Sequence, residues 1–135
     1  MQRVKIKLPY IKILFILYFA ERDQNITASK VVKVCRVNKV NYVDELCKIG
    51  LVKLYYRVKV RKRITVYVAI SKSGLEFMTK VFDLVTKHGL WDYIQVSLHN
   101  GLLLLDNEST RLIHALSLLV LRDENSNHSH KVNLN

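Results

Sequence analysis

The first hydrophobic stretch of the chain has no single apolar face. Between residues 8 and 20 only Lys12 is charged, and Pro9 suits the first turn of a helix, where its missing N–H costs nothing. The stretch predicts a helix that is apolar almost all round and needs cover on two sides. We expect C-terminal helices, of the same chain or of a partner, to supply the second cover. At helical spacing the inner face consists of Tyr10, Ile13, Leu14 and Leu17, and the other faces carry Ile11, Phe15, Tyr18 and Phe19.

Two shorter amphipathic patterns follow, over residues 28–35 and 39–49, with a polar break between them. Thr27 and Asn38 precede these patterns and are good N-cap residues. Gly50 supplies the left-handed residue that ends the second helix. The exposed side of this second helix is expected to carry Lys39, Asn41, Tyr42 and Glu45.

After Gly50 the hydrophobic period changes to two, which is typical of strands. Residues 52–60 and 64–70 are rich in β-branched side chains and are joined by a basic corner at 60–63, so they predict an antiparallel hairpin. In this prediction the apolar set faces the core and the alternate set faces solvent or a ligand. The first set is Tyr56, Val58, Val60, Ile64, Val66, Val68 and Ile70, and the second includes Tyr55, Arg57, Lys59 and Arg61.

A fourth helix is predicted directly after the hairpin. Ser71 or Ser73 opens it, and the run from Ser73 to Glu76 fits a capping box. The helix is expected to run to about His88, with Gly89 as its stop.

The C-terminal third is expected to be helical and then disordered. Residues 90–105 and 108–121 predict two further helices, and Asn100-Gly101 is a candidate break in the first of them. Residues 123–135 lack enough apolar side chains to order themselves.

These elements predict an α+β fold that is mainly α with one small β-hairpin. We expect three parts: a helix-and-hairpin unit at 1–89, a helical region at 90–122 and a disordered tail at 123–135. A chain of 135 residues with 50% hydrophobic content can bury one proper core.

The charge is divided between these parts. The chain carries a formal net charge of +11, and residues 1–89 hold 19 Lys and Arg against 6 Asp and Glu. Residues 90–135 hold only 3 against 5. Such a charge points to a polyanionic partner, and its distribution places that partner on the first part of the chain.

Three short motifs follow one another in the stretch from residue 10 to 90: the run Tyr42 to Leu46, then Gly50, Leu51 and Val52, and then Ile70, Ser71 and Gly74. With these motifs the stretch resembles the winged-helix regulators of archaea and their viruses and, more loosely, the bacterial MarR-type repressors. The resemblance implies a winged helix-turn-helix fold that binds double-stranded DNA as a homodimer, either sequence-selectively or architecturally.

The predicted hairpin carries the densest positive charge. Residues 53–63 contain six Lys and Arg and no acid, which favours contact with phosphates or the minor groove over simple protection of a strand edge. The second short helix is expected to contact base edges, and the first to anchor the neighbouring backbone. The predicted DNA contacts are Ser29, Lys30, Lys33, Asn38, Lys39, Asn41, Tyr42, Arg57, Lys59, Arg61, Lys62 and Arg63.

The C-terminal part carries more apolar surface than two helices can hide on one small domain. A twofold dimer would bury it and would place two recognition helices about 34 Å apart, one turn of DNA. The predicted dimer contacts are Phe15, Phe19, Trp91, Ile94, Leu98, Leu112, Leu116 and Leu119.

No motif in the chain predicts catalysis, a metal site or a cofactor. There is no phosphate-cradling glycine loop, no H-E-x-x-H and no G-x-S-x-G. Cys35 and Cys47 either fill core space as free thiols or form a disulfide or redox pair, and no further zinc ligand is near in sequence.

The expected location is the cytoplasm, associated with nucleoid DNA or in a host cell. No signal-peptide pattern is present, and the apolar run at 8–20 is shorter than the roughly 20 residues of a membrane span. Two alternatives to a DNA-binding regulator stay open: a protein-interaction module, and a non-specific architectural protein or double-stranded RNA binder.

Overall fold

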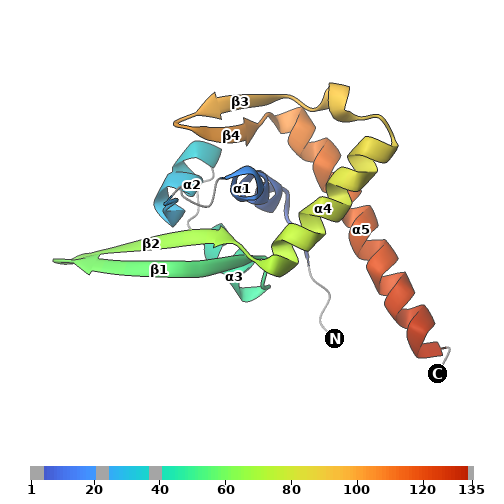
Figure 1. The fold of residues 1–135 in the computed structure, drawn as a ribbon, viewed down its shortest axis with the longest axis horizontal. Helices are drawn as coiled ribbons and strands as arrows, with labels where there is room; N and C mark the ends of the chain where they lie inside the picture. The colour runs from blue at the N-terminus through green and yellow to red at the C-terminus, as the bar shows by residue number, and fades with distance from the viewer. Residues whose placement is uncertain (1–4, 21–24, 37–40, 134–135) are drawn as a thin grey trace.

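The computed structural model describes residues 5–20, 25–36 and 41–133, and the side-chain surroundings up to Glu124. Within these residues the fold is α+β, as the sequence predicts (Figure 1). In chain order its elements are α1 (Leu8–Phe19), α2 (Ala28–Cys35), α3 (Asn41–Lys48), β1 (Val52–Val60), β2 (Arg63–Ile70), α4 (Lys72–Lys87), a 3-10 turn η1 (Trp91–Tyr93), β3 (Val96–His99), β4 (Leu102–Leu105) and α5 (Asn107–Asn133).

Helix α1 is the centre of the core. It packs against α2, α3, α4, α5, β2 and β4, and Figure 1 shows it end-on with these elements around it. This arrangement explains why α1 is apolar almost all round: its own chain buries residues 10, 11 and 13–17, and Leu8 and Phe19 at its two ends stay exposed. Two predicted dimer contacts are therefore wrong, because Phe15 packs against Phe82 with ring centroids 5.9 Å apart and Leu116 is buried in the same core.

The β1–β2 hairpin projects away from this core (Figure 1). Only its base is held. Val68 N donates to Ile26 O at 2.9 Å and Thr27 forms an isolated β-bridge with Tyr67, so the segment before α2 is paired with β2 at this one point. At the other edge α3 packs beside β1.

A β-bulge changes the faces of β1. The register shifts between Leu54 and Tyr56, and beyond it Arg57 pairs with Val66 and Lys59 with Ile64. A one-residue slip moves every later side chain to the opposite face. The prediction that Tyr56, Val58 and Val60 share the core face with Ile64, Val66, Val68 and Ile70 is therefore wrong.

Helix α4 begins at the earlier of the two predicted openings, two residues before the predicted capping box. Ser71 is its N-cap and accepts a hydrogen bond from Gly74 N at 3.0 Å. Gly74 lies against the chain entering the hairpin, and a Cβ there would stand 2.1 Å from Leu51 O. The box from Ser73 to Glu76 is ruled out because those residues already lie inside the helix.

The largest correction concerns residues 90–105, which form a turn and a second hairpin instead of a helix. Asn100 and Gly101 have φ angles of 51° and 80°, and two positive φ values are what a type I′ two-residue hairpin turn requires. Strand β4 packs on α1, which buries Leu102 and Leu105 and half-buries Leu103 and Leu104.

Helix α5 follows this second hairpin and is longer than expected. Asp106 caps it, since Ser109 N donates to Asp106 Oδ1 at 2.8 Å. The helix runs to Asn133, whereas the sequence predicts disorder from residue 123. Elongating a packed helix costs far less than starting one, which accounts for the continuation into polar residues.

Candidate nucleic-acid interface

The projecting hairpin gathers six cations with no acid between Val52 and Ile70. All six side chains are exposed. In the described part of the chain the ion pairs use Lys7 and Lys80, so none of these six cations is neutralised by an acid there. The six residues are Lys53, Arg57, Lys59, Arg61, Lys62 and Arg63, and we call them the hairpin cations.

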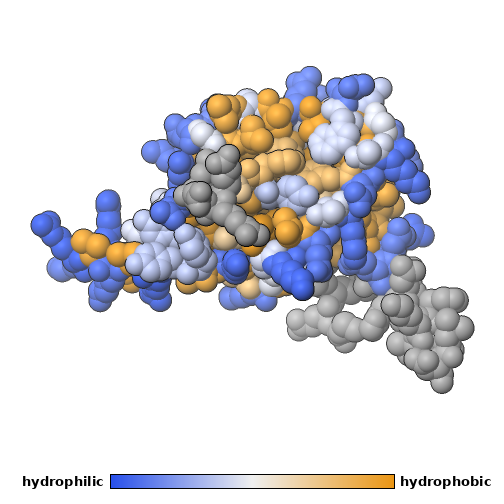
Figure 2. All heavy atoms as spheres, viewed as in Figure 1, coloured by the Kyte–Doolittle hydropathy of each residue, from blue (hydrophilic) through white to orange (hydrophobic). Residues whose placement is uncertain are grey.

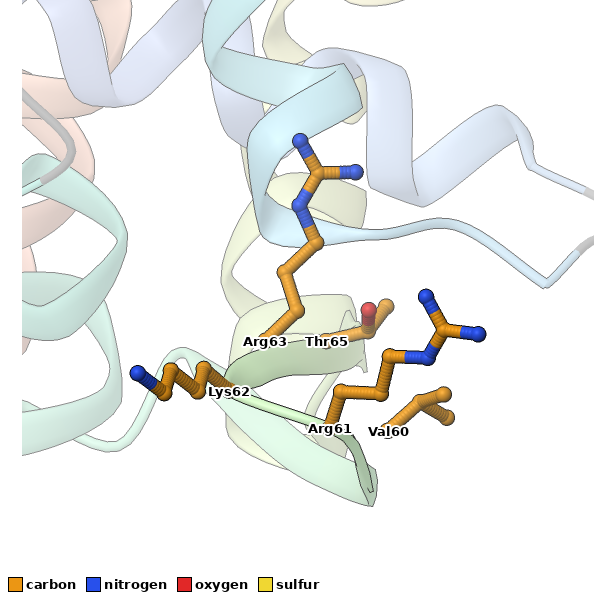
Figure 3. A pocket seen from close by; sticks show the side chains of 5 residues that line it. All are labelled: Val60, Arg61, Lys62, Arg63 and Thr65. Carbon is orange, nitrogen blue, oxygen red and sulfur yellow. The ribbon is translucent and has the colours of Figure 1, made fainter.

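The hairpin tip carries an open recess of about 550 Å³. Figure 3 shows the guanidinium groups of Arg61 and Arg63 on the same side as Val60 and Thr65, whereas Lys62 points to the opposite side. Two guanidinium forks beside one recess suit the oxygens of a phosphate group.

The turn that carries this recess is strained. Val60 pairs with Arg63, so the loop has two residues, and Arg61 has a φ of 58°. A side chain in this left-handed region costs about 1 kcal/mol relative to glycine. Arg61 holds this position although glycine would fit better.

Helix α3 presents a narrower polar face than expected. Its exposed side chains are Asn41, Asp44 and Lys48, at helical spacing. Tyr42, a predicted DNA contact, is half-buried against Tyr10 with ring centroids 6.0 Å apart. Its ring is therefore committed to packing, and Lys48 takes a place on the exposed face that the sequence prediction omitted.

Glu45 also turns inward. Lys7 Nζ lies 3.2 Å from Glu45 Oε1, and the Tyr10 hydroxyl donates to the same carboxylate. Burial and this hydrogen bond raise the pKa of Tyr10 above its ordinary value. The ion pair offsets one of the two acidic charges of α3, which leaves Asp44 as its exposed acid.

The structure brings some predicted contacts together and leaves others apart. Arg57 to Arg63 share the hairpin, and Asn41 lies on the helix beside β1. Ser29, Lys30 and Lys33 are exposed on α2, which packs beside β2. Asn38 and Lys39 lie outside the described residues.

One feature of the hairpin has no counterpart in the sequence prediction. Tyr56 and Tyr67 pair across the strands with ring centroids 5.8 Å apart, and Tyr56 is 58% exposed. They share a hairpin face with Thr65 and Arg63 because of the bulge. Alternation alone cannot reveal this, since Tyr55 and Tyr56 are both aromatic and either could face the core.

The two cysteines are free. Burial raises the pKa of the Cys35 thiol to about 12, against a smaller lowering effect of Lys12. Burial also raises the pKa of Cys47, with a further contribution from Asp44. Both thiols are therefore poor nucleophiles, and among the described residues no three His, Cys, Asp or Glu form a group that could hold a metal ion.

Comparisons with known protein families, with curated proteins and with solved structures found no significant match. In the part of the chain that the structure describes, no helix combines the length and apolar character that a bilayer crossing needs.

Proposed function

We propose that the protein binds double-stranded DNA as a winged helix-turn-helix regulator, with the β1–β2 hairpin as its wing. The observation that carries the proposal is the projecting hairpin with six exposed cations, none of which forms an ion pair with an acid within the described residues. The order α2, α3, β1, β2 supports it, because this is the order expected of a winged helix, and the β-bridge between Thr27 and Tyr67 ties the segment before α2 to the hairpin.

In this proposal the hairpin supplies most of the electrostatic affinity. Each Lys or Arg that contacts a phosphate releases condensed counterions, which makes binding fall steeply with salt. Arg61 and Arg63 flank the recess and are suited to one phosphate, while Arg57 and Lys59 lie on the other face of the ribbon. Phosphate contacts of this kind position the protein but carry no sequence information.

Sequence selectivity would come from α3. Asn41 is exposed near its start, and an asparagine amide can bond adenine bidentately in the major groove. Lys48, one further exposed side chain on the same face, can reach a phosphate or a guanine. A selective regulator and an architectural protein differ in whether this helix distinguishes one base sequence from another.

The homodimer expected from the sequence stays part of the proposal. Among the predicted contacts Phe19, Trp91, Leu98 and Leu119 are exposed, so apolar surface is left for a partner. Ile94 and Leu112 are half-buried and can contribute only at an interface edge.

The test is a binding titration of the full chain against duplexes selected from a random pool and against random duplex DNA. We expect both to bind at low salt, with log affinity falling linearly as log salt rises. A selected site that outcompetes random DNA by about a thousandfold or more supports a regulator, and a ratio near one supports the architectural alternative. Absence of duplex binding at low salt would overturn the proposal.

A further inference from the structure

The second hairpin leaves one strand edge open. Among the described residues β3 pairs only with β4, and β4 in turn packs on α1 and α2. Figure 1 shows β3 as the outermost strand, with β4 between it and the helices. An edge strand presents N–H and C=O groups that can pair with another chain.

This edge lacks the usual protection. Residues 93–105 contain no Lys, Arg, Asp, Glu or Pro, and the β3–β4 register has no bulge. Tyr93 and Leu98 are each 69% exposed and Val96 is 46% exposed. Figure 2 shows hydrophobic residues over this end of the molecule and mainly hydrophilic ones at the tip of the other hairpin.

The hydrogen-bond pattern shows which backbone groups of β3 point outward. In an antiparallel pair, successive residues alternate between bonding to the partner strand and pointing away from it. Gln95 O accepts a hydrogen bond from Asp106 N at 3.1 Å, on the β4 side. By alternation Ser97 and His99 also face β4, and the backbone groups of Val96 and Leu98 face outward.

We propose that β3 is the dimerisation strand, pairing antiparallel with β3 of a second copy to form a four-stranded sheet. The inference rests on the homodimer of the proposed function and names its interface. Because the backbone groups of Val96 and Leu98 point outward, Val96 of one copy pairs with Leu98 of the other. Ser97 then lies opposite Ser97 across the twofold axis. This register pairs both outward residues of each strand, whereas the next matching register, Leu98 against Leu98, pairs only one of them within the strand.

A second copy is the occupant that the charges favour. Two chains with a net charge of +11 repel each other wherever their basic surfaces meet. Residues 90–135 carry more acid than base, and β3 carries neither, so this end allows close approach. An antiparallel edge is also self-complementary about a twofold axis, as an isologous interface requires.

The strand alone does not bury enough area. A stable interface buries about 800 Å² per partner, which is more than four residues supply. Trp91 and Tyr93 shortly precede β3 in the chain and are 41% and 69% exposed, so the proposal includes them as additional contact area. Aromatic side chains of this kind are enriched in interface centres.

Light scattering on the full chain without DNA gives the first test. We expect twice the chain mass of 15.8 kDa at micromolar concentration. Leu98→Lys should give a monomer, because it puts like charges on both sides of the axis. Leu118→Lys is the matched control: Leu118 is a leucine 47% exposed on α5, and its change adds the same charge but should leave the dimer intact.

Disulfide cross-linking tests the register. Ser97→Cys should link two copies rapidly under a mild oxidant, since opposite residues of non-hydrogen-bonded pairs have Cα atoms about 4.5 Å apart. His99→Cys is the control, because the two copies of residue 99 would lie about 13 Å apart along the strands. Equal yields from both variants would overturn the β3 interface but leave another homodimer standing. A monomeric wild-type chain would overturn the homodimer itself, and neither result depends on whether DNA binds.

Discussion

The chain contains the same local arrangement twice, a hairpin followed by a capped helix, with opposite surface chemistry. Strand β2 leads through Ser71 into α4, and β4 leads through Asp106 into α5. The first hairpin carries six cations and projects from the core, and the second has no charged residue in either strand and lies on α1. The comparison teaches that backbone architecture alone does not assign a role, because the exposed side chains select the partner.

The two hairpins are also anchored differently. At the first, Ser71 N donates to Leu51 O at 3.0 Å and Gly74 lies directly against that carbonyl. At the second, Ser109 Oγ accepts from Gln95 N at 2.7 Å, which ties the strand entry to α5. Each anchor uses a serine in the first turn of a helix or at its cap: Ser71 donates through its backbone N–H, and Ser109 accepts through its side-chain oxygen.

The largest expected effect is the loss of stability when the anchor of the first hairpin is changed. Gly74→Ala should destabilise the protein by about 3 kcal/mol, because its Cβ would overlap the Leu51 backbone and overpacking against backbone cannot relax easily. The usual helix-propensity gain of alanine, about 1 kcal/mol, is too small to compensate. Chemical denaturation of the variant and wild type measures the difference.

Gly101→Ala is the matched change in the second hairpin. A Cβ at Gly101 meets no atom within 4 Å, so only its φ of 80° opposes the substitution. We expect a loss of about 1 kcal/mol. A loss at Gly101 as large as that at Gly74 would contradict the contrast between the two anchors.

Removing two arginines from the first hairpin should show whether DNA affinity depends on their position or only on the net charge of the protein. Arg61→Ala with Arg63→Ala should weaken binding to every duplex about equally, roughly tenfold or more. If both arginines contact phosphates, the slope of log affinity against log salt concentration should become shallower by about two units. The control is Arg111→Ala with Arg122→Ala, which removes the same two groups from exposed positions on α5. If both double variants lose the same affinity, the net charge and not the hairpin position is responsible.

The strained turn allows charge and stability to be separated. Arg61→Gly should stabilise the hairpin by about 1 kcal/mol relative to Arg61→Ala, because only glycine tolerates a φ of 58° without cost. Both variants lose the same guanidinium and should lose the same DNA affinity. Thermal unfolding and binding measured on the same two proteins check this, and a difference in affinity would mean that turn geometry contributes to binding.

A smaller effect concerns pH and the second hairpin. Hydrogen bonds from Ser109 hold the pKa of the Asp106 carboxyl below its ordinary value. A lowered pKa stabilises the fold above the unfolded pKa of about 3.9, and this stabilisation is lost as pH falls through the folded value. The Ser71 cap of the first hairpin does not titrate.

The protection of the first turn of α5 against hydrogen exchange, measured relative to the intrinsic exchange rate at the same pH, should therefore fall at acidic pH, while the protection of the start of α4 changes less. Asp106→Asn keeps an acceptor for Ser109 N but cannot titrate, so it should remove the acid sensitivity of α5. Equal acid sensitivity in the variant and the wild type would assign the effect to another carboxylate.

Sequence alone predicts the elements whose signals are local. The bounds of β1 and α2, the Thr27 cap and the left-handed Gly50 are confirmed. The second hairpin was missed because Leu102 to Leu105 is a short apolar run, which periodicity assigns equally to a helix or a strand.

The charges of the candidate site can be predicted from the sequence, but the directions in which its side chains point cannot. The hairpin cations follow from composition and a two-residue turn. Tyr42 and Glu45 could not be placed, because their partners Lys7 and Tyr10 are more than 30 residues away in the chain. The bulge at Tyr55 could not be predicted either, because the sequence around it looks the same as a regular alternating strand.

Hydrogen exchange with peptide resolution tests most directly whether the two hairpins serve different partners. The full chain would be compared dilute, concentrated, and dilute with excess duplex DNA at moderate salt. We expect DNA to protect residues 53–67, and concentration alone to protect residues 95–99. DNA protection confined to residues 93–105, with the first hairpin unchanged, would contradict the assignment of DNA to the basic hairpin.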